Sequence, residues 1–294
     1  MTPFVRRDGD DYLLYYGAGD QESRKRICVA RAKVSDPTRW ERLGVALDIG
    51  AGDAFDCRWV VVPQVVKVAA RWHLYYTANC GRGTGLQRFP GIGVAVSDDG
   101  LKFARVSDRP VLAPSGKEGD PDAMGIAGGS VVAVTNADGR TEYRFYYTGA
   151  PTIGQDIFLN QQKIVCLATS SDGIEWTKRG ALFHRIAERD YENVGVAGPV
   201  VWRDDDGLWR MLYSTIGTRW GFYSICYAES DDGLLWRRGQ AYGENLVLSP
   251  HGDGWEKQMV EYPAVIREGS GLRLFYCGNG YGTTGIGTAL SATT

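Results

Sequence analysis

Acidic residues recur at one position ahead of four similar apolar segments of the chain. These segments begin at Pro63, Gly129, Gly198 and Pro263. The residue seven places before each of them is acidic or lies between acids: Asp56, Asp122, Tyr191 (between Asp190 and Glu192) and Glu256. Carboxylates several ångströms apart, with the pKa of one raised by burial or like charge, serve as acid and base or nucleophile in glycosidic bond cleavage. The spacing indicates such a site, although single acids before strands are also ordinary turn formers.

Further polar and aromatic side chains accompany these acids. Some follow the acids directly or precede the next apolar segment: Arg58, Asn193, Gln258 and Glu261. Others lie in longer loops further along each segment: Arg82, Arg219, Trp220, Asn279 and Tyr281. Amides and guanidinium groups form hydrogen bonds with sugar hydroxyls, and aromatic rings stack on the apolar face of a sugar. These residues are therefore predicted to bind substrate. Alternatively, the loops are merely exposed and glycine-rich, or the arginines face a phosphate or carboxylate.

The composition excludes several other classes of function. Lys plus Arg is 33 and Asp plus Glu is 35, and this formal charge of −2 indicates neither a nucleic-acid nor a membrane-surface partner. No run of about 18 apolar residues is present, and the first residues have no leader-like apolar core, which predicts a cytoplasmic location. The three histidines do not have metal-ligand spacing. We expect a small-molecule or oligosaccharide substrate and no cofactor, while a single ion in a central channel and the oligomeric state stay open.

A repeat along the chain indicates how these residues are positioned. The chain has 39 glycines and 12% aromatic residues, and seven Asp-Gly dipeptides punctuate it as hairpin turns do. One strand-like segment recurs at spacings of 60, 71, 66 and 63 residues: Leu14–Gly17, Leu74–Thr77, Phe145–Thr148, Met211–Ser214 and Leu274–Cys277. Similar apolar segments precede and follow each copy. This pattern predicts an all-β, five-bladed β-propeller with blades of three to four antiparallel strands.

The predicted propeller is a single domain over residues 1–294, with blades at about 1–51, 52–118, 119–187, 188–251 and 252–294. Because the innermost strands all run in one direction, the acids before them converge on one face around the channel. The last blade is expected either to have three strands or to be completed by residues upstream of Met1. Cysteines recur at one position of the third strand, where the other copies have glycine: Cys28, Cys166 and Cys226, with Gly93 and Gly287. We expect these cysteines to be unpaired and poorly accessible.

The segment 3–16, PFVRRDGDDYLLYY, and its later copies with Ser-Asp-Asp-Gly turns resemble the five-bladed propeller glycosidases. This superfamily contains arabinanases, β-xylosidases, invertases and levansucrases, with mannoside phosphorylases as cousins. The resemblance covers nearly the whole chain. It implies that Glu261, in Glu261-Tyr262-Pro263, is the general acid.

The other two signature carboxylates of that superfamily stand directly before a strand proline. Here those places hold Thr2 and Val62, and the third copy of the segment reads Gly128-Gly129. The second catalytic carboxylate is therefore sought at Asp56, Asp122 or Glu192.

The leading hypothesis is a carbohydrate-active enzyme that acts on a glycosidic bond of a soluble sugar. Glu261 is the predicted acid, with Asp56 or Asp122 as base or nucleophile. The alternative is a non-catalytic or repurposed propeller that binds a glycan or a sugar-like metabolite in the same pocket. A third hypothesis, a propeller for protein interactions, lacks the continuous apolar or single-sign patch expected for such a surface.

Overall fold

The computed structural model describes residues 2–81, 89–136, 138–151, 162–238, 245–269 and 271–291. Its regular structure is almost entirely β-strand. The described part of the chain has one helical element, the single turn α1 (Asn279–Gly282). The strands are β1 (Pro3–Asp8), β2 (Asp11–Gly19), β3 (Lys25–Lys33), β4 (Asp36–Leu47), β5 (Trp59–Val68), β6 (Arg71–Asn79), β7 (Gly91–Ser97), β8 (Ala104–Arg105), β9 (Gly125–Thr135), β10 (Thr141–Ala150), β11 (Ile164–Ser170), β12 (Thr177–Phe183), β13 (Gly195–Arg203), β14 (Trp209–Ile216), β15 (Tyr223–Ser230), β16 (Arg237–Arg238), β17 (Leu246–Leu248), β18 (Glu261–Glu268), β19 (Gly271–Cys277) and β20 (Ile286–Leu290). The prediction of an all-β chain with little helix is confirmed.

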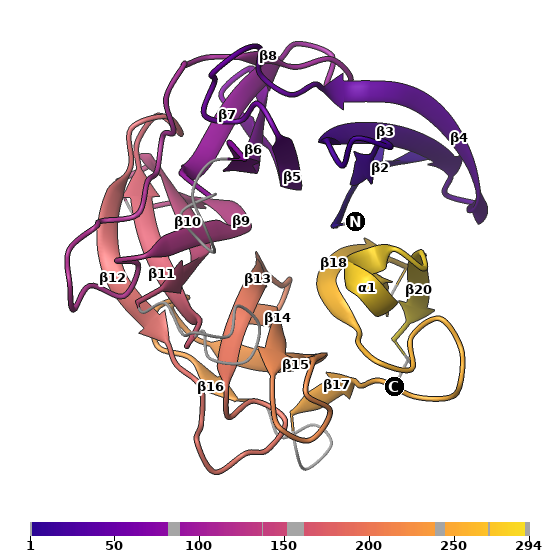
Figure 1. Cartoon of the computed structure of the whole chain (residues 1–294), viewed down its shortest axis with the longest axis vertical. Helices are drawn as coiled ribbons and strands as arrows, with labels where there is room; N and C mark the ends of the chain where they lie inside the picture. Colours follow the sequence, from indigo (N-terminus) through magenta and orange to yellow (C-terminus); the bar gives the residue numbers. More distant parts are fainter. Residues whose placement is uncertain are drawn as a thin grey trace.

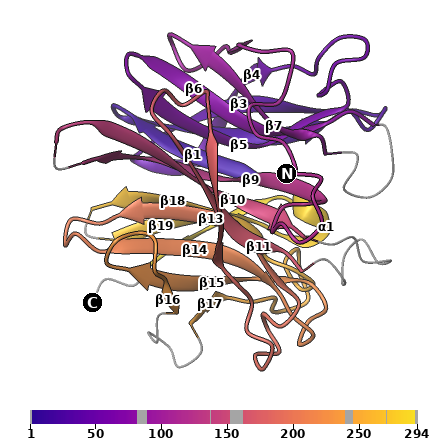
Figure 2. The same cartoon turned by 90° about the vertical axis from the view of Figure 1, so that its left-hand side faces the viewer.

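Sequential strands pair antiparallel and form sheets that radiate from a centre (Figures 1 and 2). Strands β1 to β4 form one antiparallel set and β5 to β8 another, and a single parallel pair between Lys25 and Trp59 joins the two sets into one sheet. The other sheets are β9 to β12, β13 to β17 and β18 to β20. The last of these has three strands in the described part of the chain.

The first strand of each set lies nearest the centre. Figure 1 shows β1, β5, β9, β13 and β18 around it, and each of these strands contacts the next, with β18 contacting β1. The ring of contacts is therefore continuous. Because these strands run in one direction, equivalent residues of each lie at equivalent depths in the channel.

A β-bulge near the start of the inner strands is tied to the neighbouring sheet. The registers of β5, β13 and β18 shift there, so that local backbone N–H groups have no partner in their own ladder. Hydroxyl groups of the adjacent set of strands accept hydrogen bonds from them at 2.8–3.0 Å: Thr2 from Val62, Thr77 from Gly128, Thr148 from Gly198, and Ser214 from Tyr262. Thr2, which stands where the resembling enzymes have an aspartate, thus takes part in the contact between the β1–β4 set and the β5–β8 set.

The first tyrosine of each Tyr-Tyr pair connects neighbouring sheets through a turn. The hydroxyl groups of Tyr15, Tyr75 and Tyr146 donate to the carbonyl oxygens of Gly100, Gly173 and Gly233 at 2.6–2.9 Å. Each glycine ends a Ser-Asp-containing turn of the next sheet and has φ of 73–74°, a conformation that suits glycine. The fourth and fifth copies have Leu212 and Phe275 instead. In those copies the following set of strands, β18–β20 or β1–β4, has no Ser-Asp turn that ends in glycine among the described residues.

The repeated cysteine position packs against the second tyrosine of the pair. Cys28, Cys166 and Cys226 lie opposite Tyr16, Tyr147 and Tyr213, and none of these three cysteines forms a disulfide. The prediction that they are unpaired is confirmed. Cys166 and Cys226 are buried, but Cys28 is half-buried, less protected than expected, because Tyr16 opposite it is also half-buried.

No helix in the described ranges is long and apolar enough to cross a membrane. The cytoplasmic location stays a prediction.

Tyr75→Phe tests the contact between turn and tyrosine. We expect the free energy of unfolding to fall by about 1–2 kcal/mol, because the buried carbonyl of Gly173 loses its donor. Urea denaturation provides the measurement. Tyr12→Phe is the matched control, since the buried Tyr12 hydroxyl has no hydrogen-bond partner among the described residues. Equal stability losses in the two variants would contradict the assignment.

Candidate functional site

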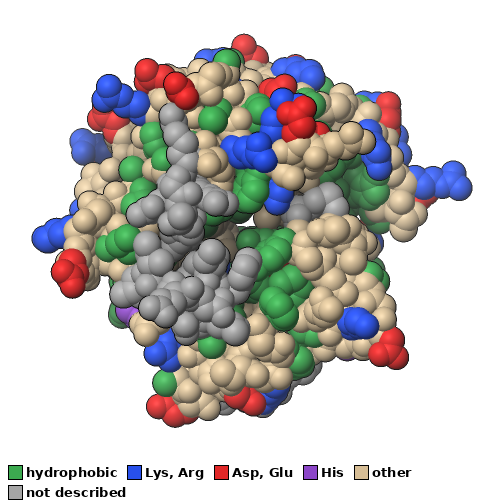
Figure 3. Space-filling model, viewed as in Figure 1, with side chains coloured by type: hydrophobic (Ala, Val, Ile, Leu, Met, Phe, Trp, Pro, Cys, Tyr) green, Lys and Arg blue, Asp and Glu red, His purple; other side chains and the backbone are tan. Residues whose placement is uncertain are grey.

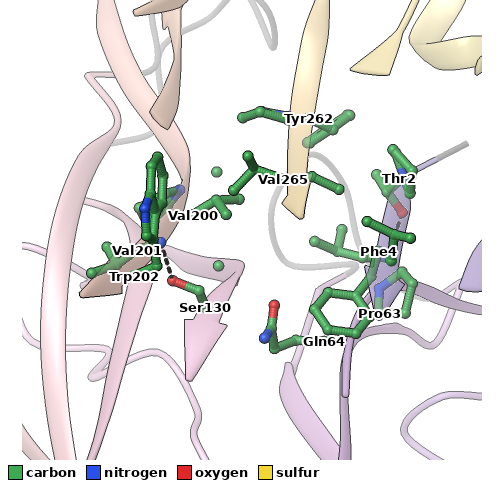
Figure 4. Close-up of a pocket in the computed structure, with 18 residues that line it drawn as sticks. Thr2, Phe4, Pro63, Gln64, Ser130, Val200, Val201, Trp202, Tyr262 and Val265 are labelled. Carbon is green, nitrogen blue, oxygen red and sulfur yellow. Dashed lines mark hydrogen bonds between the residues drawn. The ribbon is translucent and has the colours of Figure 1, made fainter. Parts of the chain in front are cut away.

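A cavity of about 200 Å³ lies between the inner strands, at the centre of the ring (Figure 4). On the face shown in Figure 3, hydrophobic side chains gather near this centre. Proline, valine and glycine form most of the cavity wall, together with Phe4, Trp202 and Tyr262. Two of its hydroxyl groups are already engaged, since Thr2 accepts from Val62 N–H and Ser130 accepts from Val201 N–H at 2.9 Å. The cavity alone therefore offers little chemistry.

The carboxyl of Glu261, the first residue of β18, belongs to the residue directly before this lining in the chain. Its side chain is 0% exposed, and neither carboxyl oxygen has a hydrogen-bond partner within the described ranges. Burial raises the pKa of Glu261 to about 8, against the opposing effect of Lys163 and Lys25. Most molecules therefore carry a protonated Glu261 at neutral pH. The following residue, Tyr262, lines the cavity and links the acid to it.

Two lysines face Glu261 from other sheets. Lys163 directly precedes β11, and its Nζ donates to the hydroxyl of Tyr223, the first residue of β15. Lys25 begins β3, and its Nζ lies 4.3 Å from the ring centre of Trp59. Burial lowers the pKa of Lys163 to about 8 and also lowers that of Lys25, while Glu261 raises both. The acid thus lies among ammonium groups rather than other carboxylates.

Aromatic residues cluster near the same carboxyl group, and Glu261 contributes to the raised pKa of Tyr223 and of Tyr281. The ring centre of Tyr223 lies 6.3 Å from that of Tyr262 and 6.2 Å from that of Tyr281, which belongs to α1. Cys277, opposite Glu261 on β19, is buried as well. These groups exclude water from Glu261, which is the physical cause of its raised pKa.

The backbone at Tyr262 has an uncommon conformation. Its φ is 52°, and the equivalent residues of two other inner strands, Val62 and Gly198, both have φ of 55°. A left-handed conformation costs a residue with a side chain about 1–3 kcal/mol, and the surrounding structure must impose it. The hydrogen bond from Tyr262 N–H to Ser214 and the bulge supply that constraint. The strained backbone conformation of Tyr262 therefore lies directly after Glu261.

The other predicted acids make different contacts. Asp56 accepts from the hydroxyl of Tyr76 at 2.8 Å and forms an ion pair with Arg105 on β8 at 2.7 Å. Asp122 makes the same pair of contacts in its own sheet, with the Tyr147 hydroxyl at 2.8 Å and Lys178 Nζ at 2.6 Å. Both aspartates are buried.

The glutamates of the last two sheets repeat this arrangement. Glu192 accepts from Tyr213 at 3.1 Å and pairs with Arg238 on β16 at 2.7 Å. Glu256 accepts from Tyr276 at 2.7 Å, and its other oxygen lies 3.0 Å from Nε2 of His251. Asp56, Asp122 and Glu192 therefore each join a tyrosine to a basic side chain of the outer strand of the same sheet, and Glu256 joins Tyr276 to His251 in the loop between β17 and β18. The structure does not bring these acids to Glu261 through any contact among the described residues.

The remaining predicted residues mostly hold loops together. The Asn193 side-chain amide bonds to the backbone N–H and the hydroxyl of Thr218 at 3.0 Å, and the side-chain Oδ1 of Asn279 accepts from Gln258 N–H at 2.8 Å. Arg219 pairs with Asp190 at 2.9 Å and lies over the ring of Trp220.

Two arginines complete the predicted set. The backbone carbonyl of Arg58 accepts from Lys25 N–H at 3.1 Å, beside the lysine that faces Glu261. Arg82 lies outside the described residues. Sequence reasoning missed Lys25, Lys163 and Tyr223; the only signal was their place at the start of a third strand. No cluster of three or more His, Cys, Asp or Glu that could hold a metal is found in the part of the chain that the structure describes.

Comparison with solved structures defines the class of fold. No protein-family model matches the chain. One solved glycoside hydrolase superposes with a TM-score of 0.78 at 18% identity, over 99% of this chain and 87% of that one. A thermostable family-43 glycoside hydrolase gives a TM-score of 0.70 at 18% identity, over 100% and 89% of the two chains. An endo-arabinase from Bacteroides thetaiotaomicron gives 0.63 at 18% identity, over 100% and 93%. The chain has the β-propeller fold of these glycoside hydrolases.

Closer relatives come from Mycobacterium tuberculosis. "Uncharacterized protein MT1551" of strain CDC 1551 / Oshkosh is 30% identical over 291 residues, 96% of this chain and 89% of the relative. "Uncharacterized protein Rv1502" of strain ATCC 25618 / H37Rv matches with the same identity and coverage. The chain belongs to the family of these two mycobacterial proteins.

The buried carboxyl predicts a pH dependence of stability. The unfolded chain releases the Glu261 proton near the ordinary pKa of 4.5, whereas the folded chain holds it to about pH 8. Between these values the unfolded state binds fewer protons, so a rise in pH lowers the free energy of unfolding by up to about 1.4 kcal/mol per pH unit. Glu261→Gln removes this pH-dependent loss of the free energy of unfolding. We expect the variant to gain stability relative to wild type from pH 5 to pH 8 in urea denaturation.

The exposed Glu175→Gln provides the control for this experiment, and its profile should follow that of wild type. Parallel pH profiles for Glu261→Gln and wild type would show that Glu261 is not the buried acid of the folded state.

Proposed function

We propose that the sheets form five blades of one propeller domain, at about residues 1–51, 52–118, 119–187, 188–251 and 252–294. The ring of contacts through β1, β5, β9, β13 and β18 supports this division. The sheet that spans β1 to β8 then corresponds to two blades, because only the pair of Lys25 and Trp59 joins its halves. The channel of such a propeller is the place where residues from several blades meet.

The function that this site supports best is action on a glycosidic bond of a soluble sugar, with Glu261 as general acid. One observation carries the proposal: a fully buried carboxyl without a hydrogen-bond partner in the described chain directly precedes Tyr262, which lines the central cavity, and the pKa of this carboxyl is raised to about 8. A glycosidic acid must be protonated near neutrality to donate to the leaving oxygen. The family-43 propeller fold of the similar structures agrees with this chemistry.

The surroundings of Glu261 suit both halves of a proton transfer. Aromatic rings and burial keep the acid neutral before the transfer. Once the proton moves to the leaving-group oxygen, the carboxylate that remains is stabilised by the ammonium groups of Lys163 and Lys25. The enclosing tyrosines offer apolar ring faces on which a sugar can stack.

The second catalytic group is sought at Asp56 or Asp122, as the sequence predicts. Their contacts favour a supporting role, because each is already bound to a tyrosine and a cation within its own sheet. A carboxylate so engaged must give up an ion pair before it can act on a water molecule or a sugar. The general acid is therefore the part of the mechanism that the geometry supports most directly.

An alternative function is glycan binding without bond cleavage. The observation that favours it is the scarcity of carboxylates in the cavity lining: Thr2 and Val62 occupy places where the resembling enzymes have acids, and Thr2 connects the β1–β4 and β5–β8 sets of strands. In this case Glu261 donates a hydrogen bond to a bound sugar and transfers no proton.

Turnover of a panel of aryl glycosides, including arabinofuranosides and xylosides, tests the leading function. On any substrate that is cleaved, Glu261→Gln should lower kcat by about 10²–10⁴-fold, the contribution of a positioned acid. Sugar binding, measured by calorimetry, should be retained. Unchanged kcat in Glu261→Gln would remove Glu261 from the mechanism, and sugar binding without turnover in wild type would favour the binding function.

Asp56→Asn and Asp122→Asn are the informative companions. If these residues support the fold, the variants lose stability in denaturation and keep most of kcat under conditions where they are folded. A loss of kcat at unchanged stability would instead assign the base or nucleophile to the aspartate concerned.

A further inference from the structure

The wall of the central cavity is uncharged and mostly apolar. None of the eighteen described residues that line this space of about 200 Å³ is a Lys, Arg, Asp, Glu or His. Four of the five inner strands contribute a proline to the wall: Pro3, Pro63, Pro199 and Pro263. Because proline has no backbone N–H, the wall has neither a charge nor a backbone donor at these places. A ligand that fills the cavity must therefore be uncharged and present mainly apolar surface.

One polar side chain of the wall is still available for a ligand. The carboxamide of Gln64, on β5, has no hydrogen-bond partner in the described chain. Figure 4 shows this group between Ser130 and Phe4, in the space that the inner strands enclose. Ser130, on the neighbouring β9, is buried and accepts from Val201 N–H at 2.9 Å, which leaves its own hydroxyl hydrogen to donate. An amide and a hydroxyl thus form one polar end of an apolar space.

The volume of the cavity limits the size of this ligand. An apolar cavity of about 150 Å³ holds one benzene molecule, whereas pockets for drug-sized ligands begin at about 300 Å³. Water needs two to four polar partners, so most of this wall holds it poorly, and an apolar ligand gains affinity when it displaces such water. A sugar is disfavoured, because its several hydroxyl groups would find too few partners there.

We propose that the central cavity binds a small uncharged aromatic ring that has one hydroxyl group, as a phenol does. The ring lies against the proline rings and the aromatic side chains of Phe4 and Tyr262, with which it makes edge and face contacts. Its hydroxyl group donates to the carbonyl oxygen of Gln64 and accepts from the Ser130 hydroxyl. Glu261 does not line the cavity, so the inference does not depend on the function proposed for that residue.

Calorimetric titration of the folded chain tests the ligand class. The ring probes are phenol and p-cresol, and the comparison compounds are toluene, benzoate and glucose. We expect a dissociation constant of about 1 mM or lower for at least one ring probe, an affinity within the range of ligands of this size. Benzoate and glucose should bind at least about 10-fold more weakly, because the wall has no cation for a carboxylate and few partners for sugar hydroxyls.

A variant that fills the cavity tests the location. Val200 lines the cavity and is half-buried, so the larger side chain of Val200→Phe should enter this space and weaken phenol binding by about 10-fold or more. Val247→Phe is the matched control, because Val247 lies on β17, is 42% exposed and does not line the cavity. Thermal unfolding shows whether each variant is folded.

Gln64→Leu tests the polar contact without filling the cavity. It should weaken phenol binding by about 5-fold, the contribution of one hydrogen bond, and leave toluene binding unchanged. Three results would overturn the inference: no binding of either ring probe, binding of glucose or benzoate as tight as that of phenol, or unchanged phenol binding in both Val200→Phe and Gln64→Leu. These titrations use no glycoside, so their outcome is separate from that of the turnover assays.

Discussion

The ring of sheets depends on how each inner strand satisfies the backbone N–H that its bulge leaves without a partner. A buried N–H without an acceptor is costly, and within its own ladder the bulged strand has none to offer. A threonine or serine hydroxyl from the adjacent set of strands accepts that bond in four places: Thr2, Thr77, Thr148 and Ser214. The same bond that joins two sheets therefore also holds the backbone next to the channel, and in β18 it holds the residue after Glu261.

The two tyrosines of each Tyr-Tyr pair make different contacts. Because successive side chains of a strand point to opposite faces, the first tyrosine reaches the turn of the next sheet and the second remains over its own sheet. Tyr75 and Tyr76 show the two roles, with hydrogen bonds to Gly173 and to Asp56. The acids that recur before the inner strands belong to the second role. Their repetition reflects the repeated construction of a sheet, which requires one anion between a tyrosine and a basic side chain.

Glu261 departs from this scheme and is chemically distinct for that reason. The equivalent residues of the other inner strands that the structure describes are apolar: Val61, Ala127 and Ala197. A carboxyl at this position enters the apolar, aromatic centre of the ring, where no tyrosine hydroxyl or guanidinium of the described chain binds it. Desolvation then outweighs the attraction of the nearby lysines, and the proton is retained. The structure thus has two kinds of carboxyl: those paired within a sheet and one enclosed at the centre.

The repeat spacing, the glycine turns and the alternation of apolar residues were sufficient to predict an all-β, antiparallel chain and the small residues opposite the tyrosines, because these features depend on neighbours along one strand or hairpin. The Glu-x-Pro segment was likewise sufficient to single out Glu261. The partners of Asp56, Asp122, Glu192 and Glu256 were not predictable in the same way, since each depends on a basic residue elsewhere in the chain, such as Arg105 or Lys178. The proximity of Lys25 and Lys163 to Glu261 was likewise decided by tertiary structure alone. Closure of the ring brings together residues from three sheets. These residues lie far apart in the sequence, and nothing in the sequence indicates which of them become neighbours.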